Sequence, residues 1–354
     1  AEYDHPMGPA SLVAPAPEYH FVPEFDKREL RVSLGSPTGR RLRPGAAGLA
    51  NRFSDPDDPF YAEALLRFAE LELTTIKHYT GWYWREGSPR ERRNDNADPS
   101  HIDWSGFNFG PFETRMTYMR RIGVRPLLCL DWANPYGVTV DFVGPPDTWG
   151  PGEIAEYAEF AEAVVTYAVA PDLVDPPVAR EPFDIAGIQP MGEPNLTTRG
   201  SRNPSTERDL ILDQYVRIAR AVVERLRQHP DPRVSGVKVF SPGVTEDIWG
   251  GSQRARWIGR MVDELPGELA VVGYDPYSKL FLEELRNYRT DVGAIRRLLE
   301  DACSEAEIGF LEFGIHGGPP TFDNIYGSRN SQLYLFGAIA NAANAGLTYP
   351  YYFS

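Results

Sequence analysis

Eight strand-like segments alternate with helix-like segments along most of this chain. The strand-like segments are short runs of apolar or β-branched residues, and the segments between them repeat apolar residues at a helical period. The predicted strands are residues 47–53, 74–79, 125–130, 184–191, 236–240, 269–274, 307–313 and 347–353. The predicted helices are residues 60–72, 112–122, 153–169, 207–228, 253–264, 291–302 and 331–343. This alternation predicts an α/β fold, the (β/α)8 or TIM barrel.

A doubly wound open sheet is the alternative that the same alternation allows. Such sheets carry a glycine-rich first turn, and neither GxGxxG nor GxxxxGK[ST] occurs in this sequence. The barrel is predicted to span residues 46–354. Residues 1–45 are rich in proline and lack periodicity, so they are predicted to form an irregular N-terminal strap packed on the barrel. No helix-like segment follows the last strand: either the strap covers that position, or the natural chain continues past Ser354.

The composition narrows the class of partner. The formal net charge is −14, which argues against a nucleic-acid partner. No run of about 18 apolar residues is present, so no segment is expected to cross a membrane. Two cysteines, Cys129 and Cys303, are too few for a disulfide scaffold or a zinc site, and no metal or organic cofactor is expected. Only four of the 36 basic residues are Lys, which is a bias typical of GC-rich bacteria. The composition leaves open whether the protein is secreted or cytoplasmic. It also leaves the oligomeric state open.

Polar and aromatic side chains gather where the predicted strands end. In a (β/α)8 barrel the reactive groups lie at the carboxyl ends of the strands. Glu193 and Glu312 each end an apolar run, and a buried carboxylate is costly unless it is paired or used. Aromatic rings can stack on the apolar faces of sugars, and amides can bind their hydroxyls. The strand ends therefore predict a carbohydrate site that also includes Trp82, Trp132, Asn134, Asn195, Trp249, Tyr277 and His316.

Four segments resemble motifs of glycoside hydrolase clan A, the retaining (β/α)8 glycosidases. The segment from Arg120 to Tyr136 is similar to the third-strand segment of families 5 and 39. Gly192-Glu-Pro-Asn195 resembles Asn-Glu-Pro-Asn, which carries the acid/base, and Leu311-Glu-Phe-Gly314 resembles Thr-Glu-Phe-Gly, which carries the nucleophile. Asp275-Pro-Tyr277 resembles the sixth-strand His-Pro-Tyr, whose Tyr hydrogen-bonds the nucleophile. The resemblance covers residues 47–354.

This resemblance implies a retaining glycoside hydrolase that works by double displacement, with Glu193 as the acid/base and Glu312 as the nucleophile. It implies cleavage of an equatorial bond, β-D-type or α-L-arabinofuranosidic, in a glycoside, oligosaccharide or polysaccharide. Retention requires the two carboxyl groups to lie about 5–5.5 Å apart. Three positions depart from the clan pattern: Gly192 replaces the usual Asn, Asp275 replaces the usual His, and Lys77 stands where an Arg is expected.

Other roles compete for the same residues. Glu312 could be a structural partner of an Arg, and Glu193 could be a solvated residue at a helix N-terminus. The aromatic rings could pack loops against the barrel, and Asn134 and His316 could serve only as loop residues. For the whole chain, the departures from the clan pattern also fit an inactive sugar-binding barrel. A non-glycosidic barrel enzyme, such as a metal-dependent hydrolase, would need His and Asp paired at strand ends, which the six His residues do not offer.

Overall fold

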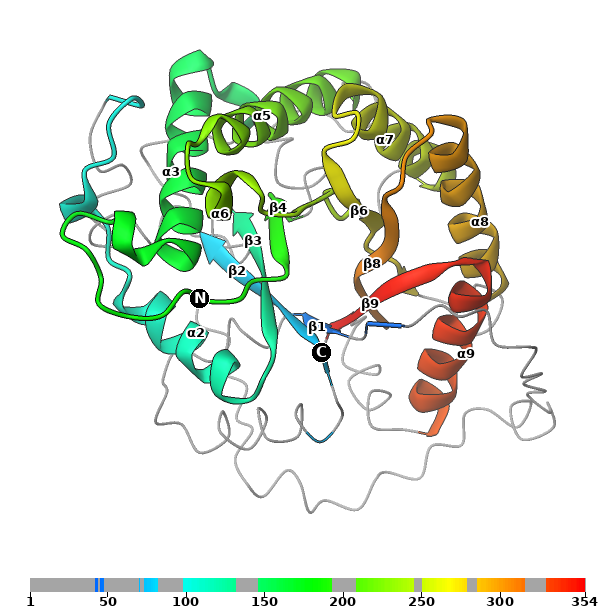
Figure 1. Cartoon of the computed structure of the whole chain (residues 1–354). Helices are drawn as coiled ribbons and strands as arrows, with labels where there is room; N and C mark the ends of the chain where they lie inside the picture. Colours follow the sequence, from blue (N-terminus) through cyan, green and yellow to red (C-terminus); the bar gives the residue numbers. More distant parts are fainter. Residues whose placement is uncertain are drawn as a thin grey trace, which may run out of the picture.

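Eight parallel strands form a closed ring in the computed structural model of this chain (Figure 1). The structure describes residues 42–43, 45–47, 70, 73–81, 98–131, 146–192, 208–244, 250–278, 285–315 and 329–353. The strands of the ring are β1 (Gly45–Ala47), β2 (Thr75–Gly81), β3 (Arg125–Asp131), β4 (Gly187–Pro190), β5 (Val239–Phe240), β6 (Leu269–Tyr274), β8 (Glu307–Ile315) and β9 (Leu347–Phe353). Each strand pairs in parallel with the next, β6 pairs with β8, and β9 pairs with β1. The predicted (β/α)8 barrel is confirmed.

Helices lie outside this ring, one after most strands (Figure 1). Their apolar faces pack on the outer side of the sheet, while their charged faces point away from it. The main helices are α2 (Gly110–Arg121), α3 (Pro151–Val169), α5 (Arg208–Gln228), α7 (Gly250–Glu264), α8 (Leu285–Asp301) and α9 (Arg329–Ala345). A short helix, α6 (Pro232–Ser235), precedes β5, and a two-residue strand, β7 (Tyr277–Ser278), pairs with the end of β8.

Alternation along the strands divides the buried residues into two cores. The larger core lies between the strands and the helices and includes Leu128, Leu130 and Phe310. The smaller core fills the interior of the barrel and consists of Leu127, Ala186, Phe240, Val271, Leu311, Tyr349 and Tyr351. Because neighbouring strand residues point to opposite faces, Lys77, Cys129 and Gln189 share the interior with this smaller core.

The barrel closes where β1 lies between β2 and β9. Gly45 pairs with Thr75 of β2 and with Tyr351 of β9. A Cβ atom at Gly45 would lie 2.6 Å from Thr75 Oγ1 and 2.6 Å from Tyr351 Cδ1. The absence of a side chain at position 45 therefore lets the Tyr351 ring fill the interior of the barrel.

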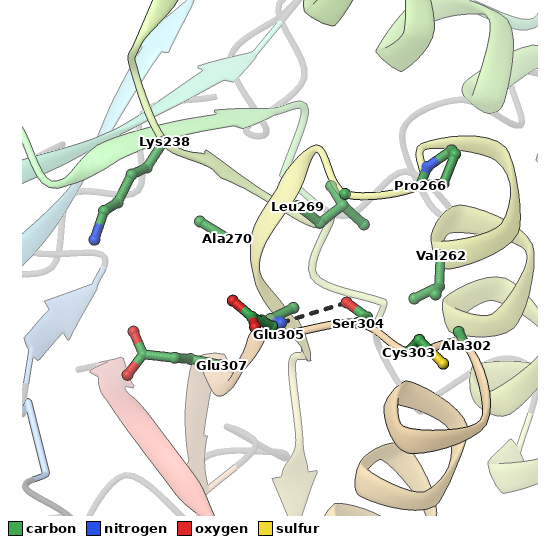
Figure 2. A pocket seen from close by; sticks show the side chains of 12 residues that line it. Lys238, Val262, Pro266, Leu269, Ala270, Ala302, Cys303, Ser304, Glu305 and Glu307 are labelled. Carbon is green, nitrogen blue, oxygen red and sulfur yellow. Dashed lines mark hydrogen bonds between the residues drawn. The ribbon is translucent and has the colours of Figure 1, made fainter.

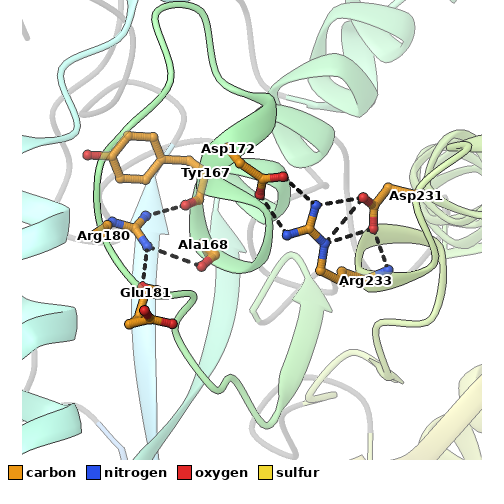
Figure 3. Close-up of polar contacts among 7 residues, drawn as sticks. All are labelled: Tyr167, Ala168, Asp172, Arg180, Glu181, Asp231 and Arg233. Carbon is orange, nitrogen blue, oxygen red and sulfur yellow. Dashed lines mark hydrogen bonds and ion pairs between the residues drawn. The ribbon is translucent and has the colours of Figure 1, made fainter.

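Arginine side chains tie the connection before β4 to its neighbours (Figure 3). Arg233 of α6 bonds Asp172 through two contacts of 2.6 and 3.0 Å, and it also bonds Asp231. The hydrogen bonds from the side chain and the backbone N–H of Arg233 lower the pKa of Asp231 to about 2. Arg180 donates to the backbone oxygens of Tyr167, Ala168 and Glu181. Such contacts fix the direction in which the chain enters β4, the strand that leads to Glu193.

The first strand differs from its prediction. We predicted residues 47–53, whereas β1 covers Gly45–Ala47, and residues 48–53 lie outside the described part of the chain. In the sequence, Pro44 and Gly45 are typical turn residues. The strand at residues 45–47 is explained by its pairing with β2 and β9, which are distant in the sequence. The predicted N-terminal strap, up to residue 41, also lies outside the described residues.

Candidate active site

A bulge in β8 directs Glu312 into the barrel. Phe310 pairs with Pro350 and Phe313 pairs with Tyr352, so three steps along β8 match two steps along β9. Phe310 and Phe313 both belong to the outer core, while Leu311 belongs to the interior core. The extra residue lets Glu312 as well as Leu311 face the interior. Bulges of this kind re-aim side chains near active sites.

Inside the barrel Glu312 meets Lys77. The Lys77 Nζ donates to Glu312 Oε1 at 2.6 Å, and the two side chains are 0% and 4% exposed. Burial lowers the pKa of Lys77, but the charges of Glu312 and Asp275 outweigh it, so the pKa lies well above its usual range. Lys77 is therefore a permanent ammonium, whose Nζ also lies 5.1 Å from the centre of the Tyr79 ring. The structure thus brings Glu312 of β8 together with Lys77 of β2.

Asp275 is a second buried carboxylate beside the same lysine. It follows β6 directly, its side chain is fully buried, and its backbone N–H donates to Val244 O at 3.2 Å. Burial raises the pKa of Asp275 to about 6, against the opposing effects of the Lys77 charge and the Glu312 backbone N–H. That N–H faces the carboxylate, yet neither Asp275 oxygen has a well-formed hydrogen bond among the described residues. The carboxylate packs instead against Gly243, where a Cβ atom would lie 2.1 Å from both oxygens.

The segment that leads to Glu193 reaches the same end of the barrel. A Cβ atom at Gly192 would lie 3.4 Å from Cys129 Sγ and 3.7 Å from Tyr79 Cε1, both on interior positions of neighbouring strands. The Gly192 carbonyl accepts a hydrogen bond from Gly243 N–H at 3.2 Å. Met191, just before it, has a φ of 61°, a left-handed conformation that is costly for a side chain other than glycine. The chain therefore turns sharply at Met191, just after β4.

Two tyrosines from the helix layer hold the strand ends. The Tyr157 hydroxyl of α3 donates to Leu130 O at 2.5 Å, and the Tyr215 hydroxyl of α5 donates to Pro190 O at 2.9 Å. Both acceptors lie among the last residues of their strands, directly before the segments that carry the predicted site. Leu130 O also accepts from the Met191 backbone N–H at 2.8 Å, so the Tyr157 hydroxyl is its second donor.

Most of the predicted site residues lie outside the described part of the chain: Trp82, Trp132, Asn134, Glu193, Asn195, Trp249 and His316. Tyr277 is described through its backbone, which pairs with Gly314 near the end of β8. The closeness of Lys77, Asp275 and Glu312 is the part of the site that the sequence did not predict. The available signal was the alternation in β2, which sets Lys77 on the same face as Thr75 and Tyr79.

The described residues also line two clefts, and both lie away from Glu312. The first, of about 600 Å³, lies at the opposite end of the barrel, where Lys238, Leu269 and Glu307 mark the starts of strands (Figure 2). The second, of about 530 Å³, lies on the outer flank between Trp104 and the Glu162–Arg225 ion pair. Among the described residues no three His, Cys, Asp or Glu side chains are grouped as metal ligands. None of the described helices is long and apolar enough to cross a membrane.

Several solved structures that share this fold are described as glycosidases. A glucosidase from Croceicoccus marinus matches with a TM-score of 0.62 and 17% identity, over 89% of this chain and 60% of its own. An exo-β-1,4-mannosidase from an Opitutaceae bacterium matches with a TM-score of 0.56 and 14% identity, over 89% of this chain and 52% of its own. A family 39 β-xylosidase from Caulobacter crescentus has the same TM-score and identity, over 89% of this chain and 63% of its own.

This chain spans between half and two thirds of the length of these three proteins. No sequence-defined protein family matches the chain, and no curated protein matches it by sequence. A broad-specificity family 5 endoglucanase is also among the structures that share the fold. The resemblance that the motifs predicted, to the (β/α)8 glycoside hydrolases of families 5 and 39, is therefore confirmed at the level of the fold.

Proposed function

We propose that this protein is a retaining glycoside hydrolase in which Glu312 is the nucleophile and Glu193 is the general acid/base. The observation that carries the proposal is the bulge in β8, which sends the Glu312 carboxylate inward against the ammonium of Lys77. The 2.6 Å bond from Lys77 fixes the orientation of this carboxylate, and a nucleophile that must reach one carbon atom needs such an orientation.

A purely structural ion pair is the competing explanation for Glu312. A buried ion pair contributes little net stability, because desolvating two charges offsets their attraction. Apolar side chains of similar volume would fill the interior of the barrel at least as well. The bulge adds a further local cost, since it interrupts the pairing of β8 with β9. Both costs, the desolvation of two charges and the interrupted pairing, arise from placing one carboxylate in the interior of the barrel. This supports a chemical role for Glu312.

The proposed reaction has two displacements. Glu312 attacks the anomeric carbon while Glu193 protonates the departing oxygen, which gives a glycosyl ester on Glu312. Glu193 then takes a proton from water, which attacks the same carbon and releases the sugar with its original configuration. Lys77 holds the Glu312 carboxylate in one orientation through its 2.6 Å bond. The two displacements use side chains of this chain and one molecule of water.

The proposed substrate is a glycoside with an equatorial bond at the anomeric carbon. The neighbouring structures are described as a glucosidase, an exo-β-1,4-mannosidase, a β-xylosidase and an arabinofuranosidase, so their descriptions name several sugars rather than one. Aryl β-D-glucoside, mannoside, galactoside and xyloside, together with aryl α-L-arabinofuranoside, cover this range. Release of the phenol from one of them would identify the sugar.

The test of the nucleophile is Glu312→Gln on that substrate. We expect kcat to fall by at least about 10³-fold, because the amide cannot form the glycosyl ester. Glu307→Gln is the matched control, because Glu307 begins the same strand and lies at the opposite end of the barrel, bonded to Arg43. Equal activity of the Glu312→Gln variant and the wild type would overturn the assignment.

The test of retention is Glu193→Ala with sodium azide. Without the acid/base, azide can enter the space left by the side chain and attack the glycosyl ester, and we expect a glycosyl azide with the same anomeric configuration as the substrate. Nuclear magnetic resonance of the product reads that configuration. An inverted product from the wild-type enzyme would contradict a double displacement.

A further inference from the structure

Asp275 follows the end of β6, and this position alone does not require its side chain to be buried. Its side chain is 0% exposed, and neither oxygen has a hydrogen bond of good geometry among the described residues. The backbone of Gly243 fills the space beside both oxygens. A carboxylate enclosed in this way is costly, and such groups are usually paired or used.

The charged groups that face Asp275 are few among the described residues. The Lys77 ammonium acts on it from β2, and Lys77 and Asp275 each alter the pKa of the other. Glu312 of β8 faces Asp275 with its backbone N–H, while its carboxylate bonds Lys77. Cys129 of β3 also acts on the pKa of Lys77. The segment after β5, residues 241–244, contributes no titratable side chain. Lys77 makes its ion-pair contact with Glu312, so Asp275 acts on the lysine through space.

We propose that Asp275 is a positioning residue that shares the charge of Lys77 with Glu312, and that its ionisation increases the activity of the enzyme. This inference rests on the proposed role of Glu312 as the nucleophile. When Asp275 is ionised, the three groups carry one net negative charge; when it is protonated, they carry none. The transition state of glycoside hydrolysis carries positive charge on the sugar, so the ionised cluster stabilises it more.

The activity test compares Asp275→Asn with the wild type across pH. We expect similar kcat/KM near pH 4.5, where Asp275 is protonated, and a loss of about tenfold near pH 7.5, where it is ionised. Asp291→Asn is the matched control: Asp291 accepts from the Tyr274 hydroxyl at 3.3 Å on the outer side of β6, so its activity should follow the wild type at every pH.

A stability test requires no activity. The pKa of Asp275 is raised on folding, to about 6, so its protonated form favours folding at low pH and this contribution is lost as the pH rises through 6. Asparagine stays neutral, so the melting temperature of Asp275→Asn should exceed that of the wild type by an amount that grows between about pH 4 and pH 6.5. A variant that is more stable but less active at neutral pH is the expected signature.

The two tests separate this inference from the proposed function. If no glycoside is cleaved, the proposed function fails, and the melting temperatures still report whether Asp275 titrates in the interior. If the wild type is active and the ratio of the two kcat/KM values is independent of pH, Asp275 has no positioning role. Asp275→Ala removes the same charge with a smaller side chain, so a pH-independent result from both variants would overturn the inference even if one of them folds poorly.

Discussion

Lys77 and Glu312 carry opposite charges at a depth where water contributes little. Each charge loses most of its hydration there, and their 2.6 Å contact replaces part of it, with the Asp275 carboxylate acting on Lys77 as well. The loss of one partner is therefore expected to cost more than the loss of both. That asymmetry makes this pair the most direct residue-scale probe of the site.

Lys77→Met tests that asymmetry. Methionine matches the length of the lysine chain but leaves Glu312 buried without its cation, so we expect a loss of about 3–5 kcal/mol in the free energy of unfolding. Adding Glu312→Gln should restore part of this loss, because the amide carries no charge to desolvate. Urea unfolding of the wild type, both single variants and the double variant measures the coupling. Additive effects would show that the pair does not interact in solution.

At the scale of elements, the sequence predicted strands and helices where local pattern and packing agree. The strand predicted at 269–274 is β6, and the strand predicted at 347–353 is β9. The helix predicted at 153–169 differs from α3 by two residues, at Pro151 and Gly152, which begin the first turn. These elements carry a clear period, and their ends coincide with proline or glycine.

The elements that shape the site were harder to predict. The strand predicted at 236–240 is only Val239–Phe240, because residues 232–235 form a helical turn capped by Asp231. The bulge in β8 leaves no local signal, since it arises from how β8 fits β9. A regular strand through 307–313 would put Leu311 and Glu312 on opposite faces. The place of Glu312 near the end of a strand could be predicted from the sequence. The bulge that turns its side chain inward could not.

Tyr215→Phe tests whether the helix layer fixes the strand end before Glu193. Losing the hydroxyl leaves Pro190 O buried and unpaired, which should cost about 1–3 kcal/mol in the free energy of unfolding. We also expect a several-fold fall in kcat with little change in KM, because the displaced strand end leads to Glu193, the proposed acid/base.

The control for this change is Tyr167→Phe, which removes a hydroxyl that donates to Glu113 at 2.6 Å on the outer flank. It should leave kcat unchanged. If Tyr215→Phe also leaves kcat unchanged, the bond from α5 stabilises the fold without positioning the site.

At the scale of the whole molecule, the closed ring joins segments that are far apart in the chain. β1 connects β9 with β2, so residues near 45, 75 and 351 depend on one another. A barrel has no free edge strand, and each strand therefore supports two neighbours. The positions of Lys77 on β2 and Glu312 on β8 follow from this closure, since two strands of the ring, β1 and β9, lie between them.

Gly45→Ala tests the closure directly. The added Cβ would lie 2.6 Å from both Thr75 Oγ1 and the Tyr351 ring, so β1 must move away from β2 or β9. We expect a loss of about 1–3 kcal/mol in stability. Because the ring couples its strands, hydrogen exchange should show loss of amide protection in both β2 and β9, although more than 250 residues separate them.

The control is Gly152→Ala, in the first turn of α3, where no atom lies within 4 Å of the new Cβ. We expect the amide protection of β2 and β9 in this variant to equal that of the wild type. Protection lost in one strand alone would mean that β1 is an accessory to the barrel rather than the strand that closes it.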